Sequence, residues 1–105
     1  MWLFLSNGFF SVVNHRDLDE HVLIRARRRK HITDTFGDEN IYVLKNADYP
    51  FRLNLSKSEF VGVLYNYIDD MEYGNFKRSI KNSKFAVMCA NVWREIYTVY
   101  GDERP

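Results

Sequence analysis

Short stretches in the first half of the chain alternate between apolar and polar residues, which is the pattern of β-strands with one buried face. The clearest are Phe9 to Val13 and Val22 to Arg27, and polar residues 14–20 between them predict a hairpin loop. The second strand separates apolar from basic side chains: Val22, Ile24 and Ala26 share one face, and Leu23, Arg25 and Arg27 share the other. Trp2 to Leu5 is also compatible with a strand, and the turn residues Ser6-Asn7-Gly8 follow it.

Two more strands are predicted further along. Ile41 to Leu44 is a short apolar candidate, and the residues around Pro50 form a turn or extended link. Phe51 to Leu55 alternates cleanly, so we expect its apolar side chains to point inward and its polar ones outward: Phe51, Leu53 and Leu55 against Arg52 and Asn54.

A helical spacing begins after Arg28. Ile32 and Phe36 lie four residues apart, which predicts a short helix ending at Gly37. Ser56 and Glu59 form a capping box, so a second helix should begin there and run to about Glu72. Its apolar stripe is Phe60, Leu64, Tyr67, Ile68 and Met71.

After a break at Tyr73-Gly74-Asn75, residues 76–81 predict one further turn, with Phe76 and Ile80 facing the core. The last helix should begin near Ser83, end at Gly101 and carry the stripe Ala86, Cys89, Ala90, Trp93, Ile96, Tyr97 and Tyr100.

The element order β-β-α-β-β-α-α predicts an α+β fold, with a mainly antiparallel sheet and helices packed on one face. Two successive β-β-α units could pair in a ferredoxin-like arrangement with permuted connections, and the strand order stays open. The chain has 105 residues, without repeats or linker composition, so we expect one domain over residues 1–105.

Composition narrows the classes of function. The formal net charge is only +1, so any affinity for nucleic acid must come from a local patch. The single Cys89 excludes an internal disulfide and a cysteine-based zinc site, and fits a reducing compartment. The opening MWLFLSNGFF has no cationic leader, and no apolar run approaches the ~20 residues that cross a bilayer. A cytoplasmic protein without membrane association is expected.

The stretch HVLIRARRRK, residues 21–30, concentrates the positive charge of the chain in Arg25, Arg27, Arg28, Arg29 and Lys30. Guanidinium groups bind phosphate in a bidentate manner, and the neighbouring rings of Phe9, Tyr42 and Tyr49 could stack on bases. Cations at a helix start oppose the helix dipole, so something other than helix stability places them there. The alternative is an ordinary solvent-facing surface that is partly neutralised by Asp34, Asp38 and Glu39.

A second candidate set lies in the segments before a strand and after a helix: Tyr49, Arg52, Tyr73, Asn75, Phe76 and Lys77. Polar and aromatic residues in such segments often form a recognition edge. The alternative is structural, with Tyr73 and Phe76 closing the end of the core. The sequence favours neither.

Catalytic and metal-binding signatures are weak. His15, His21 and His31 have no metal-ligand spacing, and the glycines form no nucleotide-binding loop. Surface ion pairs with Lys77, Arg78 or the basic run are a better interpretation of Asp69, Asp70 and Glu72 than acid–base catalysis, and Cys89 should be a buried, inert thiol. No cofactor or metal is predicted, and an enzyme would have only Asp69, Asp70, His31 and Arg25 as candidates.

Four blocks occur in order: GFFSVV (8–13), LIRAR (23–27), ADYPFR (47–52) and MEYGNFK (71–77). With Met-Trp at the start and a tryptophan in the last helix, the chain resembles a group of small bacterial and phage proteins that carry GFFSVV, VRAR, DYPYR and I-x-Y-x-NFK blocks. The resemblance covers most of the chain, implies a shared fold and carries over no catalytic role. The run Arg28-Arg29-Lys30 is less typical, so binding by it would be particular to this protein.

The main hypothesis is therefore a non-enzymatic binding module whose Arg-rich corner engages nucleic acid or an acidic protein surface. A phage-like origin suggests one concrete version, an inhibitor of a host defence or nucleic-acid-handling complex. The alternative is an interaction module that forms a homodimer through a sheet edge or the aromatic helix face and binds no nucleic acid.

Overall fold

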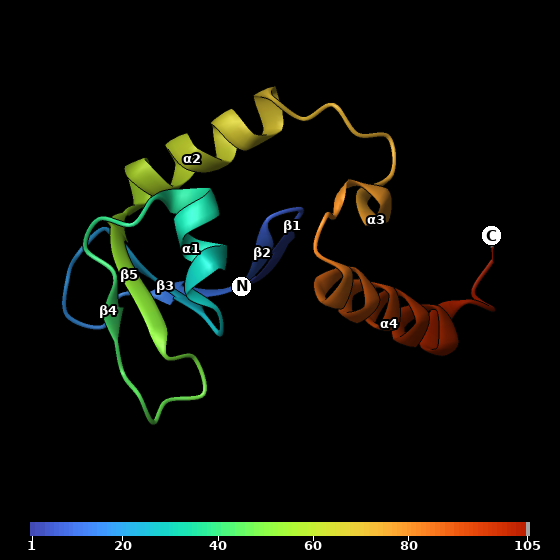
Figure 1. The fold of residues 1–105 in the computed structure, drawn as a ribbon, viewed down its shortest axis with the longest axis horizontal. Helices are drawn as coiled ribbons and strands as arrows, with labels where there is room; N and C mark the ends of the chain where they lie inside the picture. The colour runs from blue at the N-terminus through green and yellow to red at the C-terminus, as the bar shows by residue number, and fades with distance from the viewer. Residues whose placement is uncertain (105) are drawn as a thin grey trace. The chain divides into compact units, whose positions relative to one another are not determined.

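The computed structural model of the chain describes residues 1–104, and these residues form five strands and four helices (Figure 1). They divide into two compact units, residues 1–72 and the residues from Tyr73 onward. The sequence shows no linker composition at this boundary. A single domain over the whole chain stays a prediction.

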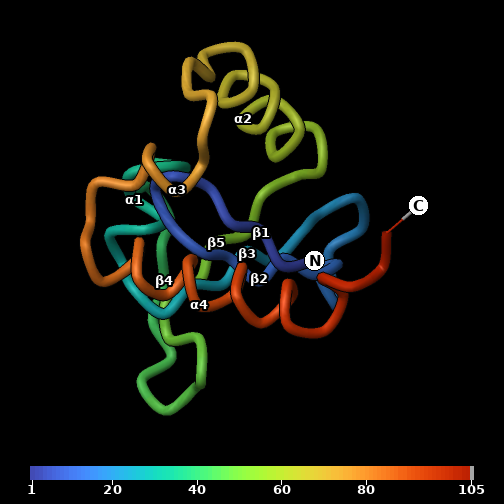
Figure 2. The backbone as a smooth tube through the Cα atoms, turned by 90° about the vertical axis from the view of Figure 1, so that its right-hand side faces the viewer, coloured from blue at the N-terminus to red at the C-terminus, as the bar shows by residue number. Residues whose placement is uncertain are grey.

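All five strands belong to one antiparallel sheet in the first unit, and Figure 2 marks each of them along the backbone tube. Their order across the sheet is β1-β2-β3-β5-β4, which the sequence left open. The bounds are Trp2–Leu5 for β1, Gly8–Asn14 for β2, His21–Ala26 for β3, Tyr42–Val43 for β4 and Phe51–Ser56 for β5. The predicted α+β class with an antiparallel sheet is confirmed. Trp2–Leu5, which the sequence showed only to be compatible with a strand, is one of the five strands of this sheet.

The core lies between one face of this sheet and two helices, α1 (Arg29–Phe36) and α2 (Lys57–Asp69). Val12 lies opposite Ile24, and Ile24 lies opposite Leu53, so these three strands present their apolar side chains to the same face. Ile32 of α1 and Phe60 of α2 are buried in that same cluster. Burying a side chain of this size stabilises the fold by about 1.5–3 kcal/mol. The predicted strand faces and the packing of both helices on one face are confirmed.

The capping box of α2 is formed as predicted. The Ser56 hydroxyl accepts from the Glu59 N–H at 3.1 Å, and Glu59 Oε1 accepts from the Ser56 N–H at 3.1 Å. These bonds, first from the Ser56 side chain and then from its backbone, hold the pKa of Glu59 below its ordinary value. Along the predicted apolar stripe, Phe60 is buried and Leu64 and Tyr67 pack against the core. The last two residues of the stripe, Ile68 and Met71, are exposed. The helix ends at Asp69, earlier than the predicted Glu72, so Met71 lies beyond it.

The second unit contains a short helix α3 (Phe76–Ser79) and a long helix α4 (Ser83–Tyr100). The side chain of Asn82 caps α4 by accepting from the Phe85 N–H at 3.0 Å. Cys89 is buried as predicted, and burial raises the pKa of its thiol. The predicted stripe of α4 is only partly covered, because the residues of its C-terminal half are more than half exposed: Trp93, Ile96, Tyr97 and Tyr100. Within the described part of this unit, only the four-residue α3 accompanies α4.

Candidate binding site

The strand register places one residue from each strand in a single row on the sheet face opposite the core. The row, called here the open-face row, follows from four successive cross-strand pairs: Trp2 with Ser11, Ser11 with Arg25, Arg25 with Arg52, and Arg52 with Tyr42. It has an aromatic ring at each end and two guanidinium groups in the middle. Both helices of the first unit pack on the other face.

Tyr49, in the loop before β5, organises the arginines of this face. Its ring is buried, at 8% exposure, and the guanidinium carbons of Arg25 and Arg27 lie 5.1 and 5.2 Å from the ring centroid. Its carbonyl oxygen accepts a hydrogen bond from Arg52 Nε at 3.1 Å. Arg25 also donates to the hydroxyl of buried Ser11 at 2.7 Å. We call Arg25, Arg27, Tyr49 and Arg52 the Tyr49 cluster.

The Tyr49 cluster carries positive charge without a counter-ion. Of the described carboxylates, none forms an ion pair with its three arginines. Arg25 and Arg52 stand directly opposite each other on neighbouring strands, and like charges in that position destabilise a sheet. In addition, Arg25 Nε is buried and has no hydrogen-bond partner among the described residues. The arrangement is suited to an anion with several oxygen atoms.

The rest of the predicted basic block lies at the start of α1. Arg28 is the N-cap residue without a side-chain cap, and the first turn contains no acidic residue. Lys30 forms an ion pair with Asp34 at 3.0 Å, one turn later on the helix, so the predicted neutralisation holds for this cation. Arg28 and Arg29 are exposed. The structure therefore brings Arg25 and Arg27 together with Tyr49 and Arg52, and leaves residues 28–30 as the exposed continuation of that chain segment.

A series of rings leads from the edge of the sheet to the Tyr49 cluster. The Phe9 ring lies 5.8 Å from Trp2, 4.6 Å from Phe4 and 6.4 Å from Tyr49, between ring centroids. Trp2 is 71% exposed. Sequence reasoning missed Trp2 and Ser11 as site residues. The alternation of β2 did place Ser11 on the face of Phe9, but only the register shows that this face also carries Trp2 and Arg25.

His31 connects α1 to the strand that carries Phe9. Its Nδ1 accepts a hydrogen bond from the Phe9 N–H at 3.3 Å, which requires an unprotonated Nδ1. Burial lowers the pKa of His31 most, and nearby Arg28 lowers it further, while the charge of Asp34 acts in the opposite direction. The lowered pKa favours the neutral form of His31, whose Nδ1 positions the backbone of β2.

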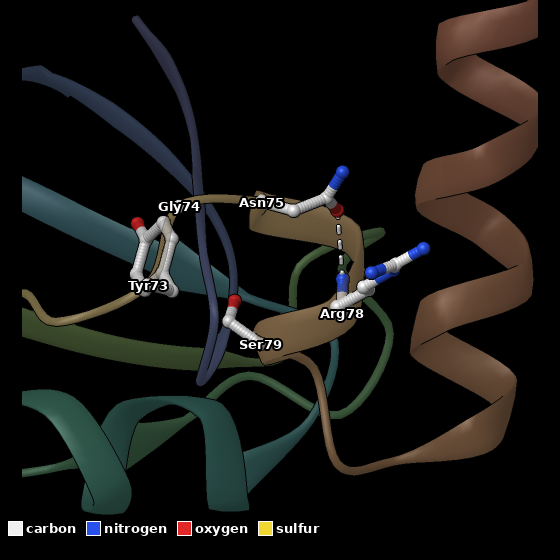
Figure 3. Close-up of a pocket in the computed structure, with 5 residues that line it drawn as sticks. All are labelled: Tyr73, Gly74, Asn75, Arg78 and Ser79. Atoms are coloured by element: carbon white, nitrogen blue, oxygen red, sulfur yellow. Dashed lines mark hydrogen bonds between the residues drawn. The ribbon is translucent and has the colours of Figure 1, made fainter.

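The other predicted site residues, Tyr73, Asn75 and Lys77, lie in the second unit, and Figure 3 shows the first two of them. Asn75 caps α3 by accepting from the Arg78 N–H at 3.1 Å, Tyr73 meets the Phe76 ring edge-on at 6.1 Å, and Lys77 Nζ lies 4.2 Å from the Trp93 ring centroid. An open hollow of about 440 Å³ is lined by Tyr73, Gly74, Asn75, Arg78 and Ser79. Asn75 and Lys77 therefore have structural roles within this unit.

The structure also shows where the acidic and metal-ligand candidates of the sequence lie. Across the described residues, no group of three His, Cys, Asp or Glu side chains could hold a metal ion. Asp69, Asp70 and Glu72 are exposed and form no ion pair within the described residues of their own unit. No described helix is long and apolar enough to cross a membrane.

Comparisons of the chain with models of protein families, with curated proteins and with solved structures found no match. The resemblance to small bacterial and phage proteins therefore stays a prediction, and the binding site is argued from its geometry.

Proposed function

We propose that this protein is a non-enzymatic binding module whose Tyr49 cluster holds the phosphate groups of a nucleic acid. One observation carries the proposal. Arg25 and Arg52 lie opposite each other on neighbouring strands, Arg27 shares the Tyr49 ring with Arg25, and no described carboxylate neutralises their charge. Folding brings these charges together at a cost, and a phosphate group would remove that cost by accepting hydrogen bonds from more than one guanidinium group.

The surroundings favour nucleic acid over an acidic protein surface. Carboxylates would also pair with the arginines, but they make no use of the exposed Trp2 ring or the Tyr42 ring in the same row. Bases do, because every base has a flat face that stacks on an aromatic side chain. The exposed Arg28 and Arg29 next to the cluster would extend the contact along a phosphate backbone.

A salt titration tests the proposal. Binding of short labelled RNA and DNA should weaken steeply with ionic strength, and Arg27→Gln and Arg52→Gln should each weaken it and flatten the salt dependence. Arg16→Gln is the matched control, because it removes the same charge from an exposed position in the loop between β2 and β3. Equal losses in all three variants, or binding to an acidic polypeptide in preference to both nucleic acids, would contradict the proposal.

The resemblance to phage proteins favours one class of partner, a host complex that handles nucleic acid or serves in defence. The protein would then compete with the nucleic acid of that complex. A pull-down from the native host tests this version. Capture that is lost in Arg52→Gln and retained in Arg16→Gln supports it, and capture that is insensitive to both variants contradicts it.

A homodimer is the second candidate, and the exposed half of the α4 stripe favours it. Trp93 and Tyr97 stack at 5.6 Å, and together with Ile96 and Tyr100 they form a continuous apolar surface of α4. A second copy could cover it, because exposed apolar surfaces of this kind mark interaction sites. Light scattering should then show a dimer that Ile96→Lys dissociates and Asn91→Lys, on the same helix, leaves intact. A monomer at all concentrations would exclude it.

A further inference from the structure

We infer that the nucleic acid is single-stranded and lies along the open-face row, with a phosphate between Arg25 and Arg52 and bases on the rings of Trp2 and Tyr42. This inference rests on the proposed function and goes beyond it, because phosphate binding alone does not distinguish a duplex from a single strand.

The shape of the site excludes contacts with base edges in the major groove of a duplex. The row crosses all five strands, and four spacings between strands amount to about 19 Å from end to end. The major groove of a duplex is roughly 12 Å wide and admits a helix or a two-stranded ribbon, so this face cannot enter it. The bases of a single strand can turn outward and meet rings that lie on the face of a sheet.

The two end rings differ from the ring in the centre of the face. Tyr49 is buried and already carries Arg25 and Arg27, so its role is to position the guanidinium groups. Trp2 is 71% exposed and meets Phe9 at an interplanar angle of 84°, so Phe9 supports it without stacking on it. Tyr42 is also exposed, and its hydroxyl donates to Asn54 Oδ1 at 3.4 Å, which holds its ring over the sheet. Trp2 and Tyr42 are therefore the rings with free surface.

The distribution of charge along the open-face row agrees with a single-stranded nucleic acid that lies along it. The positive charge of the row is confined to its middle, at Arg25 and Arg52, whereas Ser11 is a neutral residue that holds Arg25 in place. A single strand that crosses the sheet would set its negative backbone over the two arginines and its apolar base faces at the ends. Stacking and charge would then act on the same ligand at separate positions.

The chain contains two tryptophans, Trp2 and Trp93, which allows a direct test. In Trp93→Phe, Trp2 is the only indole, and oligothymidylate or oligouridylate should quench its fluorescence. In Trp2→Phe, the remaining Trp93 should not respond. Trp2→Leu should weaken binding of the single strand about tenfold, whereas Trp93→Leu, the same substitution at the other exposed tryptophan, should leave it unchanged. Circular dichroism of each variant confirms that it is folded.

The outcomes separate the two proposals. A duplex of mixed sequence that binds as tightly as the single strand, with Trp2 fluorescence unchanged and binding still lost in Arg52→Gln, would overturn the inference and leave the proposed function standing. An absence of binding to either form at low ionic strength would overturn both. A preference for the single strand with quenching confined to Trp2 supports both.

Discussion

At the scale of single residues, Gly8 allows His31 of α1 to lie directly against strand β2. A Cβ atom at residue 8 would stand 2.4 Å from His31 Cγ, a separation at which atoms must move. Gly8 is thus required for space, and not for an unusual backbone angle. The contact matters for the site because His31 also holds the N–H of Phe9.

We therefore expect Gly8→Ala to lower the free energy of unfolding by about 1–3 kcal/mol, the usual cost of overpacking. Gly62→Ala is the control, because nothing lies within 4 Å of a Cβ atom at that position in α2. That variant should gain up to about 1 kcal/mol from helix propensity. Urea denaturation measures both, and equal effects would show that the His31 contact is not tight.

His31 also predicts how stability depends on pH. Its pKa in the folded protein lies below the ordinary value of 6.5, so the unfolded chain binds the proton more readily. The stability that His31 contributes is complete above pH 6.5 and is lost as the pH falls below it. Urea midpoints measured from pH 7.5 down to 5.5 should decrease for the native protein. In His31→Asn the decrease should be smaller, and an unchanged slope would contradict the assignment.

At the scale of elements, the sequence predicted which face each strand turns to the core, because strand side chains alternate regardless of the partner strand. It also predicted the start of α2, because Ser56 and Glu59 lie three residues apart on one local segment. It could not predict that Arg25 faces Arg52. That pairing depends on register, and a slip of one residue would send Arg25 to the other face of the sheet. The sequence also could not show that half of the α4 stripe is exposed, because periodicity predicts an apolar face and does not say what covers it.

The pairing of Arg25 with Arg52 predicts a response to anions. Inorganic pyrophosphate should raise the melting temperature of the native protein more than sodium chloride at the same ionic strength, because it binds the folded state only. In Arg52→Gln this difference should shrink, and in Arg16→Gln it should persist. Differential scanning fluorimetry measures all three. A similar gain in Arg52→Gln would mean that pyrophosphate binds elsewhere.

At the scale of the whole molecule, the buried core cluster of the sheet is complete within residues 1–72. The open-face row and the Tyr49 cluster lie in the same unit. A chain of this length buries enough surface to be marginally stable without further elements. Folding and the proposed binding should therefore both be properties of the first unit.

A fragment of residues 1–72 should accordingly unfold cooperatively in urea and bind single-stranded oligonucleotide with a salt dependence close to that of the full chain. The full chain is the reference, and far-UV circular dichroism and fluorescence anisotropy are the measurements. A fragment that is folded and does not bind would move the site into the second unit or require both.

The strand order has a consequence for how the molecule forms. β1, β2 and β3 are neighbours in sequence and in the sheet, whereas β5 reaches β3 only after α1 and β4 have been passed. Contacts between distant segments close late, because the intervening chain must lose its freedom first. The pair Arg25–Arg52 thus arises only when β5 docks, and a nascent chain would display a basic strand without the proposed anion site. Ligands that bridge these arginines should act on the final step of folding and slow its reversal.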